Sequence, residues 1–464
     1  MENVLRVVTL AACTFAAACA PSSDVPAVGE QGAMTLFQGA RLIIGDGSVI
    51  EPGAMLVQGD RIVAIGPVGA VDGPAGLTTV DLTGKTVIPA LIDAHAHLGY
   101  EATTSWGADH YTRENLIDNL ERYAYYGFGA AFSAGSDPDD FALGLAAEQA
   151  AGAVGGARFL FAAGMAPPGQ GPNNQFLVHT AAVAERTGMT VLRGITSEAD
   201  ARAAVAAVAA KGIRFVKIWV DDRGGSQQKL APELYRAVIA EARSRGLSVV
   251  VHQQSPDDMP GLLDAGVTGF LHGRLGPSLD GALAMRIHDA GAYLVPNLGL
   301  GELRRERVAD DPFLRETVRG DVIARLGTAF DARPTGGGGG ASGEAALRTS
   351  MASLLAADVD VVLGTDAGAV PDHFFGYTGH RELEIFVRLG MTPMQALVAA
   401  TSRPAARLGL TDMGMLAPGM AADFVVLDAN PLDDIRNTRS ISSVYLRGGA
   451  VDRAALRSRW TGGS

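Results

Sequence analysis

The sequence predicts an α/β protein: a (β/α)8 TIM barrel with a small β-sandwich domain built from both termini. Eight apolar strand candidates alternate with helical segments through the middle of the chain. Short strands cut by Gly, Asp and Pro turns flank this region on both sides. The length of 464 residues suits a barrel of about 250 to 400 residues plus a smaller attachment.

The N-terminus predicts export. Residues 1–20 have a basic Arg6 followed by an apolar run too short to span a bilayer, as in a signal peptide of the lipoprotein type, and residues 21–33 look like a linker. The segment 16–19 resembles a lipobox that would place a lipid on Cys19, whereas 18–20 fits ordinary signal peptidase. An uncleaved anchor helix is the third alternative. We therefore expect a periplasmic or outer-membrane lipoprotein, alternatively a secreted protein, with membrane contact only through that lipid.

The predicted sandwich combines residues 34–88 with residues 414–455. Its first part has short apolar runs at 40–44, 54–57, 62–65 and 86–88, and its second part has them at 419–427 and 443–446.

The predicted barrel occupies residues 89–413, and its first strand begins at the domain boundary. Strand candidates are 87–94, 129–134, 158–163, 215–220, 248–251, 268–271, 292–296 and 359–363. Most are apolar on both faces, as strands covered by helices must be. Predicted helices include 114–126, 197–211, 232–245, 279–290, 345–357 and 393–408. A doubly wound open sheet is the alternative, and the glycine run 336–340 predicts a mobile loop, either an active-site lid or an inert linker.

Composition narrows the function. The hydrophobic fraction of 47% supports a large core, and the formal net charge of -12 argues against a nucleic-acid partner. The only cysteines, Cys13 and Cys19, lie in the predicted signal peptide, so any metal in the folded part must be bound by nitrogen and oxygen. We expect a small-molecule substrate, and the sequence leaves a homo-oligomer open.

Metal-ligand residues recur where predicted barrel strands end. His95 and His97 end the first strand, and alternation along an extended chain points them the same way. His252, His272 and Asp366 end the fifth, sixth and eighth strands. Barrel enzymes place function at these strand ends, and imidazole with carboxylate suits zinc, manganese, iron or nickel.

Lys217 lies in the middle of the apolar strand 215–220, where a buried ammonium is costly. It either pairs with Asp221 or Asp222, or it reacts with CO₂ to give a carboxylate that can bridge two cations.

Other polar residues are weaker candidates. Tyr100 follows the first ligands, and Arg223 would either bind a substrate carboxylate or form a surface ion pair. Asn297 ends the seventh strand and should face the same mouth, and His179 falls in a loop after the third strand. The remaining histidines are expected in structural or surface roles: His110, His288, His373 and His380.

These motifs together resemble the amidohydrolase superfamily from about residue 34 to 451. The His-x-His pair, the lysine, two later histidines and the aspartate occur in the family's order, followed by 390–393, 400–401, 418–423 and 430–432. Segments 215–222 and 380–383 look closest to the imidazolonepropionase-like and Xaa-Pro dipeptidase-like branch.

The resemblance implies two divalent metal ions, which we expect to be zinc. It assigns His95, His97 and Asp366 to the buried ion, His252 and His272 to the exposed one, and N6-carboxylated Lys217 to both. Asp366 would be catalytic, moving the proton of a metal-bound hydroxide to the leaving amine.

The same resemblance implies cleavage of an amide, in a small peptide or an N-acyl amino acid. His252 is followed by Gln253 and Gln254 instead of the glutamate usual in deaminases, which argues against deamination. The alternatives are a lactone or ester hydrolase with the same site and a non-catalytic cell-surface binding lipoprotein.

Overall fold

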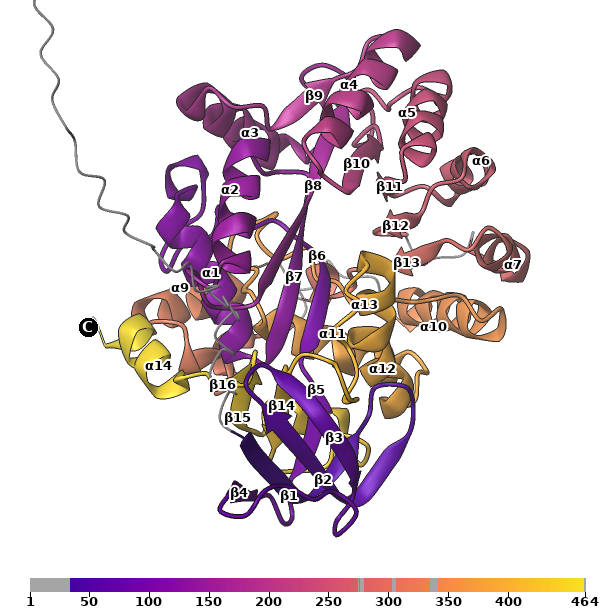
Figure 1. The fold of residues 1–464 in the computed structure, drawn as a ribbon. Coiled ribbons are helices and arrows are strands. Elements are labelled where there is room, and N and C mark those ends of the chain that lie inside the picture. The colour runs from indigo at the N-terminus through magenta and orange to yellow at the C-terminus, as the bar shows by residue number, and fades with distance from the viewer. Residues whose placement is uncertain (1–33, 274, 276–278, 303–305, 334–340, 463–464) are drawn as a thin grey trace, which may run out of the picture.

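A computed structural model describes residues 34–273, 275, 279–302, 306–333 and 341–462 (Figure 1). The predicted signal peptide, the linker and the glycine run 336–340 lie outside the described residues. Within the described part of the chain, no helix has the length and apolar character needed to cross a membrane.

A parallel sheet forms the predicted barrel. Its strands are β6 (Leu91–Ala96), β7 (Phe128–Ala134), β8 (Arg158–Ala166), β10 (Phe215–Val220), β11 (Ser248–Gln253), β12 (Gly269–Leu271) and β13 (Tyr293–Val295), which pair in this order. A short extra strand, β9 (Leu192–Gly194), also pairs with β8.

The predicted eighth strand, 359–363, is a chain segment that makes only isolated bridges. On one side Leu294 N donates to Asp360 O at 2.9 Å, and on the other Ala94 N donates to Leu363 O at 3.0 Å. Bridges Leu294–Val361 and Ala96–Ala367 follow the same two edges. The segment therefore joins β13 to β6 and closes the ring, which excludes the open-sheet alternative.

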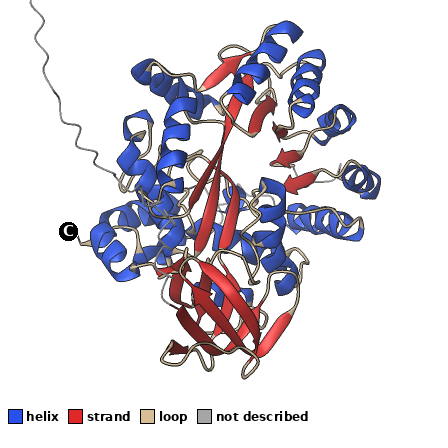
Figure 2. Ribbon diagram, viewed as in Figure 1, coloured by secondary structure: helices blue, strands red, loops and turns tan. Residues whose placement is uncertain are grey.

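Helices surround the barrel strands, as Figure 2 shows. They are α1 (Arg113–Tyr125), α2 (Asp139–Ala150), α3 (Asn174–Thr187), α4 (Glu198–Ala210), α5 (Pro232–Ser244), α6 (Met259–Ala265), α7 (Gly281–Asp289), α8 (Gly299–Glu302), α9 (Gly320–Asp331), α10 (Ala341–Ala356), α11 (Tyr377–Arg388), α12 (Pro393–Ala400), α13 (Ser402–Leu408) and α14 (Arg453–Thr461). Short 3-10 turns are η1 (Ala108–His110), η2 (Pro256–Asp258), η3 (Val308–Asp310), η4 (Leu314–Glu316) and η5 (Ile435–Arg439). The predicted helix 393–408 is two helices, because Thr401 has φ −129° and ψ −87°, outside the helical region.

Both ends of the described chain contribute to a separate eight-stranded sheet (Figure 1). Its members are β1 (Met34–Ile43), β2 (Val49–Gln58), β3 (Arg61–Pro67), β4 (Thr78–Asp81), β5 (Thr86–Pro89), β14 (Phe424–Leu427), β15 (Ile441–Leu446) and β16 (Gly449–Ala450). The single strand predicted at 87–94 is therefore two. Its first half, β5, pairs antiparallel with β14, and β6 begins the barrel after Ala90.

Alternation along the barrel strands determines which side chains reach the interior. Phe215 and Val250 belong to the apolar cluster inside the ring, whereas Val216 and Val251 pack in the cluster shared with the helices. Two residues further along each strand, Lys217 and His252 share the inward face. Polar groups on this face therefore meet at the C-terminal mouth of the barrel, and apolar side chains fill the interior behind them.

Candidate active site

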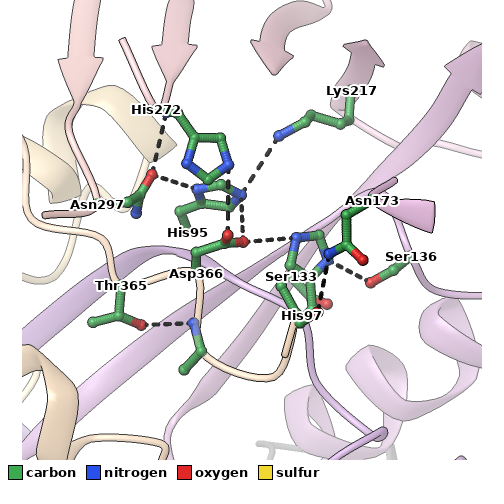
Figure 3. A network of polar contacts seen from close by, with 12 residues as sticks. His95, His97, Ser133, Ser136, Asn173, Lys217, His272, Asn297, Thr365 and Asp366 are labelled. Atoms are coloured by element: carbon green, nitrogen blue, oxygen red, sulfur yellow. Dashed lines mark hydrogen bonds and ion pairs between the residues drawn. The ribbon is translucent and has the colours of Figure 1, made fainter. Parts of the chain in front are cut away.

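Side chains from four separate strand ends meet at the barrel mouth. Figure 3 shows His95, His97, His272, Lys217 and Asp366 directed toward one another. The His95 ring centroid lies 5.4 Å from that of His97 and 4.9 Å from that of His272. The remaining predicted ligand joins the same group, since the His252 ring lies 4.6 Å from the His272 ring.

Asp366 is the centre of this cluster. Its Oδ1 lies 3.3 Å from Nε2 of His95 and 3.1 Å from Nε2 of His97, and its Oδ2 lies 3.5 Å from Nε2 of His272. Ligand atoms of His95, His272 and Asp366 all lie within 4.8 Å of one another, a spacing that one metal ion can fill. Burial raises the pKa of Asp366, but attraction to the protonated forms of His95 and His272 outweighs burial and lowers that pKa well below the usual range.

Asn297 fixes the tautomer of His95. Its Oδ1 accepts from the backbone N–H of His272 at 3.2 Å, which identifies that atom as the amide oxygen. The same oxygen lies 2.9 Å from Nδ1 of His95, so Nδ1 must carry the proton. Burial lowers the pKa of His95 well below its usual value, so the ring is neutral and Nε2 has a lone pair. That lone pair faces Asp366.

Two of the other three strand-end rings, those of His97 and His252, also have one nitrogen held by the protein. Nδ1 of His97 lies 2.8 Å from Oγ of Ser136, and Nε2 of His252 lies 2.9 Å from Oδ2 of Asp221. Burial lowers the pKa of both rings, and it lowers that of His272 to about 4. Near pH 7 all these imidazoles are neutral, which is the form that binds metal ions.

Lys217 is buried, and its Nζ lies 3.5 Å from Nε2 of His95. Among the described residues it forms no ion pair. The predicted partner Asp221 instead binds Arg223 and His252, and Asp222 accepts from the backbone N–H of Gly224. The ion-pair alternative for Lys217 is therefore wrong, and burial lowers its pKa to about 7.

Backbone strain marks the same place. Arg223, His272, Asn297 and Asp366 have φ between 49° and 78°, in the left-handed region that non-glycine residues avoid. Elsewhere in the described chain only three non-glycine residues have positive φ. Strained residues of this kind persist where the surrounding structure fixes them, and they concentrate at functional sites.

The two substrate candidates lie in different surroundings. Tyr100 is completely buried, and its hydroxyl donates to the backbone oxygen of Ser136 at 2.7 Å. The Tyr100 hydroxyl therefore donates its proton to Ser136, the residue that contacts His97, and not to a substrate. Arg223 is only 13% exposed and pairs with Asp221 at 3.1 Å, so the ion pair predicted for the surface is largely buried. Its Nε has no partner among the described residues.

The other histidines support loops. Nδ1 of His179 accepts from Ala108 N at 3.1 Å, and His373 Nε2 donates to Thr365 O at 2.9 Å beside Asp366. His380 lies between Tyr126 O and Thr438 Oγ1, whereas His110 and His288 make exposed contacts. The roles of Ser136 and Asp221 were not predicted, although their positions just beyond the ends of β7 and β10 were available as a signal.

Fold and site together define a barrel hydrolase with a buried histidine–aspartate centre. Residues 86–451 match the model of the amidohydrolase family, and the chain belongs to that family, whose members hydrolyse carbon–nitrogen bonds. The predicted superfamily is confirmed, and its enzymatic character argues against the non-catalytic alternative.

Relatives come from the predicted branch. Imidazolonepropionase of Streptomyces griseus is 25% identical over 404 residues, covering 83% of this chain and 89% of the relative. A candidate prolidase from Bifidobacterium longum is 26% identical with a TM-score of 0.67, covering 92% of this chain and 99% of that one. A prolidase crystallised with N-methylphosphonate-L-proline shares the fold at 22% identity and a TM-score of 0.68, covering 90% and 99%.

Proposed function

We propose that this chain is a metal-dependent amidohydrolase that cleaves the amide bond of a small peptide or N-acyl amino acid. The contact between Nε2 of His95 and Oδ1 of Asp366, at 3.3 Å, carries the proposal. Because Asn297 holds the proton on Nδ1, a lone pair and a carboxylate oxygen face each other in a buried site. Two electron-rich atoms repel unless a positive group lies close to both. Nζ of Lys217 lies 3.5 Å from Nε2 of His95, and a divalent ion bound by both atoms would make the contact more favourable.

The proposal includes two such ions. His95, His97 and Asp366 would hold one, and His252 and His272 the other, with Lys217 between them as a carboxylated side chain. Nitrogen and oxygen donors without cysteine suit zinc. When bound, the ions supply Lewis acidity, which makes water nucleophilic at neutral pH and polarises a carbonyl group.

Carboxylation of Lys217 is supported by its environment. A pKa near 7 leaves a substantial part of the side chain as the neutral amine, and only this form attacks CO₂. The new N–C bond gives a carbamic acid that loses one proton, so the product is an anion with two oxygen donors. The charge of Asp366 favours the protonated amine, but burial outweighs it and lowers the pKa of Lys217.

Asp366 and Arg223 would act directly on substrate and water. Asp366 is ionised at neutral pH, and its carboxylate would accept a proton from the attacking water and return it to the leaving nitrogen. Arg223 offers a buried guanidinium with Nε unpaired, which suits a free carboxylate of a peptide or N-acyl amino acid.

A substrate panel tests the proposal. The purified chain, loaded with Zn²⁺, Mn²⁺ or Co²⁺, is assayed with dipeptides, N-acyl amino acids, their C-terminal amides, and lactones. We expect metal-stimulated amide hydrolysis. In Arg223→Met, KM should rise more for substrates with a free carboxylate than for their amides. Well-folded protein with neither bound metal nor metal-stimulated turnover would refute the proposal. Turnover of lactones alone would replace it with the esterase alternative.

The two-ion arrangement has its own test. Lys217→Ala should lose one of two bound ions and most of the activity, whereas Lys211→Ala, which removes an ammonium paired with Asp139 and Asp140, should keep both. Metal content is measured by elemental analysis after gel filtration. If Lys217→Ala retains two ions and full activity, the bridging role is wrong.

A further inference from the structure

Asp221 joins a proposed metal ligand to a buried arginine. Its Oδ2 lies 2.9 Å from Nε2 of His252 and 3.1 Å from Nη1 of Arg223. Its Oδ1 accepts from the backbone N–H of Arg223 at 3.1 Å, and Nη2 of Arg223 donates to Gly171 O at 3.0 Å. With its side chain only 12% exposed, Asp221 is held on both oxygens and cannot rotate without breaking these contacts.

The contact with His252 determines the position of a proton. A carboxylate that also receives two donors from Arg223 is an acceptor, so Nε2 of His252 must be the donor. A neutral imidazole has one N–H, and the lone pair of His252 therefore lies on Nδ1. In His95 the arrangement is reversed: Nδ1 donates to Asn297, so the nitrogen lone pair lies on Nε2.

The partners of the ligand histidines also differ in charge. Asn297 and Ser136, which hold His95 and His97, are neutral, whereas Asp221 is an anion. An anionic acceptor makes the remaining ring nitrogen more basic, and such supporting carboxylates typically change metal affinity by about 10–100-fold.

We infer that Asp221 is a positioning residue that keeps the proton of His252 on Nε2, so that Nδ1 is the atom presented to a divalent cation. Arg223 fixes the carboxylate in place and balances its charge. The cation itself rests on the proposed function, but the tautomer is a property of the metal-free protein and can be tested without it.

The first experiment measures the tautomer. Long-range ¹H–¹⁵N correlation spectra of the metal-free full chain, labelled at histidine, distinguish the protonated from the unprotonated ring nitrogen. His252, assigned by its loss in His252→Gln, should have its proton on Nε2. This preference should disappear in Asp221→Ala and persist in Asp222→Ala. Asp222 is the adjacent carboxylate, and it accepts from the backbone N–H of Gly224. A proton on Nδ1 in the wild-type chain would overturn the inference.

The second experiment measures affinity. Metal-free wild type, Asp221→Ala, Asp221→Asn and Asp222→Ala are titrated with Co²⁺ against a chelator, with melting curves to establish folding. We expect Asp221→Ala to lower the affinity for the more weakly bound Co²⁺ ion by about 10–100-fold. Asp221→Asn should lower that affinity less, and Asp222→Ala should match wild type. Equal affinities in Asp221→Ala and Asp222→Ala would contradict the positioning role. If the wild type binds no Co²⁺, the proposed function fails, and the tautomer measurement still decides on Asp221.

Discussion

Replacement of Asn297 should show how strongly this site depends on one amide oxygen. That oxygen accepts from Nδ1 of His95 at 2.9 Å and from the backbone N–H of His272 at 3.2 Å. Asn297→Ala leaves Nδ1–H of His95 without an acceptor, at about 1–3 kcal/mol, whereas the backbone N–H of His272 still donates to Val295 O at 2.9 Å. Alanine at φ 49° adds about 1 kcal/mol of backbone strain. We therefore expect the free energy of unfolding of the metal-free protein to fall by about 2–4 kcal/mol.

Two further variants of Asn297 separate these contributions. Asn297→Gly loses the acceptor but relieves the left-handed strain, so it should be less destabilised than Asn297→Ala by up to about 1 kcal/mol. Asn297→Asp keeps the acceptor and tolerates the same φ, so it should be affected least.

Urea unfolding of the metal-free chains measures stability, and Zn²⁺ competition with a chelator measures affinity. Metal affinity should fall about 10–100-fold in Asn297→Ala and Asn297→Gly, because the His95 proton is no longer fixed on Nδ1. If Asn297→Ala keeps both wild-type stability and wild-type affinity, the tautomer argument for His95 is wrong, and with it the main support for the metal site.

Three further predictions concern other parts of the chain. Burial raises the pKa of Asp137 to about 6 from an ordinary 3.8, so its contribution to stability is present below about pH 4 and lost as pH rises through 6. Wild type should therefore lose about 3 kcal/mol relative to Asp137→Asn between pH 4 and 7 in urea unfolding, and parallel pH profiles would contradict this. Tyr100→Phe should cost about 0.5–1.5 kcal/mol of stability with KM unchanged, since its hydroxyl binds Ser136 O, and a raised KM would instead place Tyr100 against substrate. We propose that the mature chain begins at a lipidated Cys19, which mass spectrometry should detect and Cys19→Ser should abolish; an unmodified N-terminus after residue 20 would favour soluble export.

Most strand positions and the order of the ligands could be predicted because they are local properties. Apolar runs ending in His95, His252 or Asp366 are visible in the sequence, and the barrel fold brings such ends together. Two strands were predicted less well. Segment 87–94 is apolar apart from Asp93, and Pro89 is the one local sign that β5 ends there and pairs in the terminal sheet. Segment 359–363 looks like a strand but receives its partners only from isolated bridges.

The sequence by itself determined the fold class, the family and the six proposed ligands, because hydrophobic periodicity and residue spacing are written along the chain. Only the tertiary structure decided how those ligands are held. Asn297, Ser136 and Asp221 each come from a different strand end than the histidine they contact, and hydrogen-bond direction depends on spatial neighbours. The same holds for Lys217, whose pKa near 7 follows from burial and the absence of an ion pair among the described residues. The sequence alone cannot give the direction of these hydrogen bonds or the pKa of Lys217, because residues distant in sequence determine both.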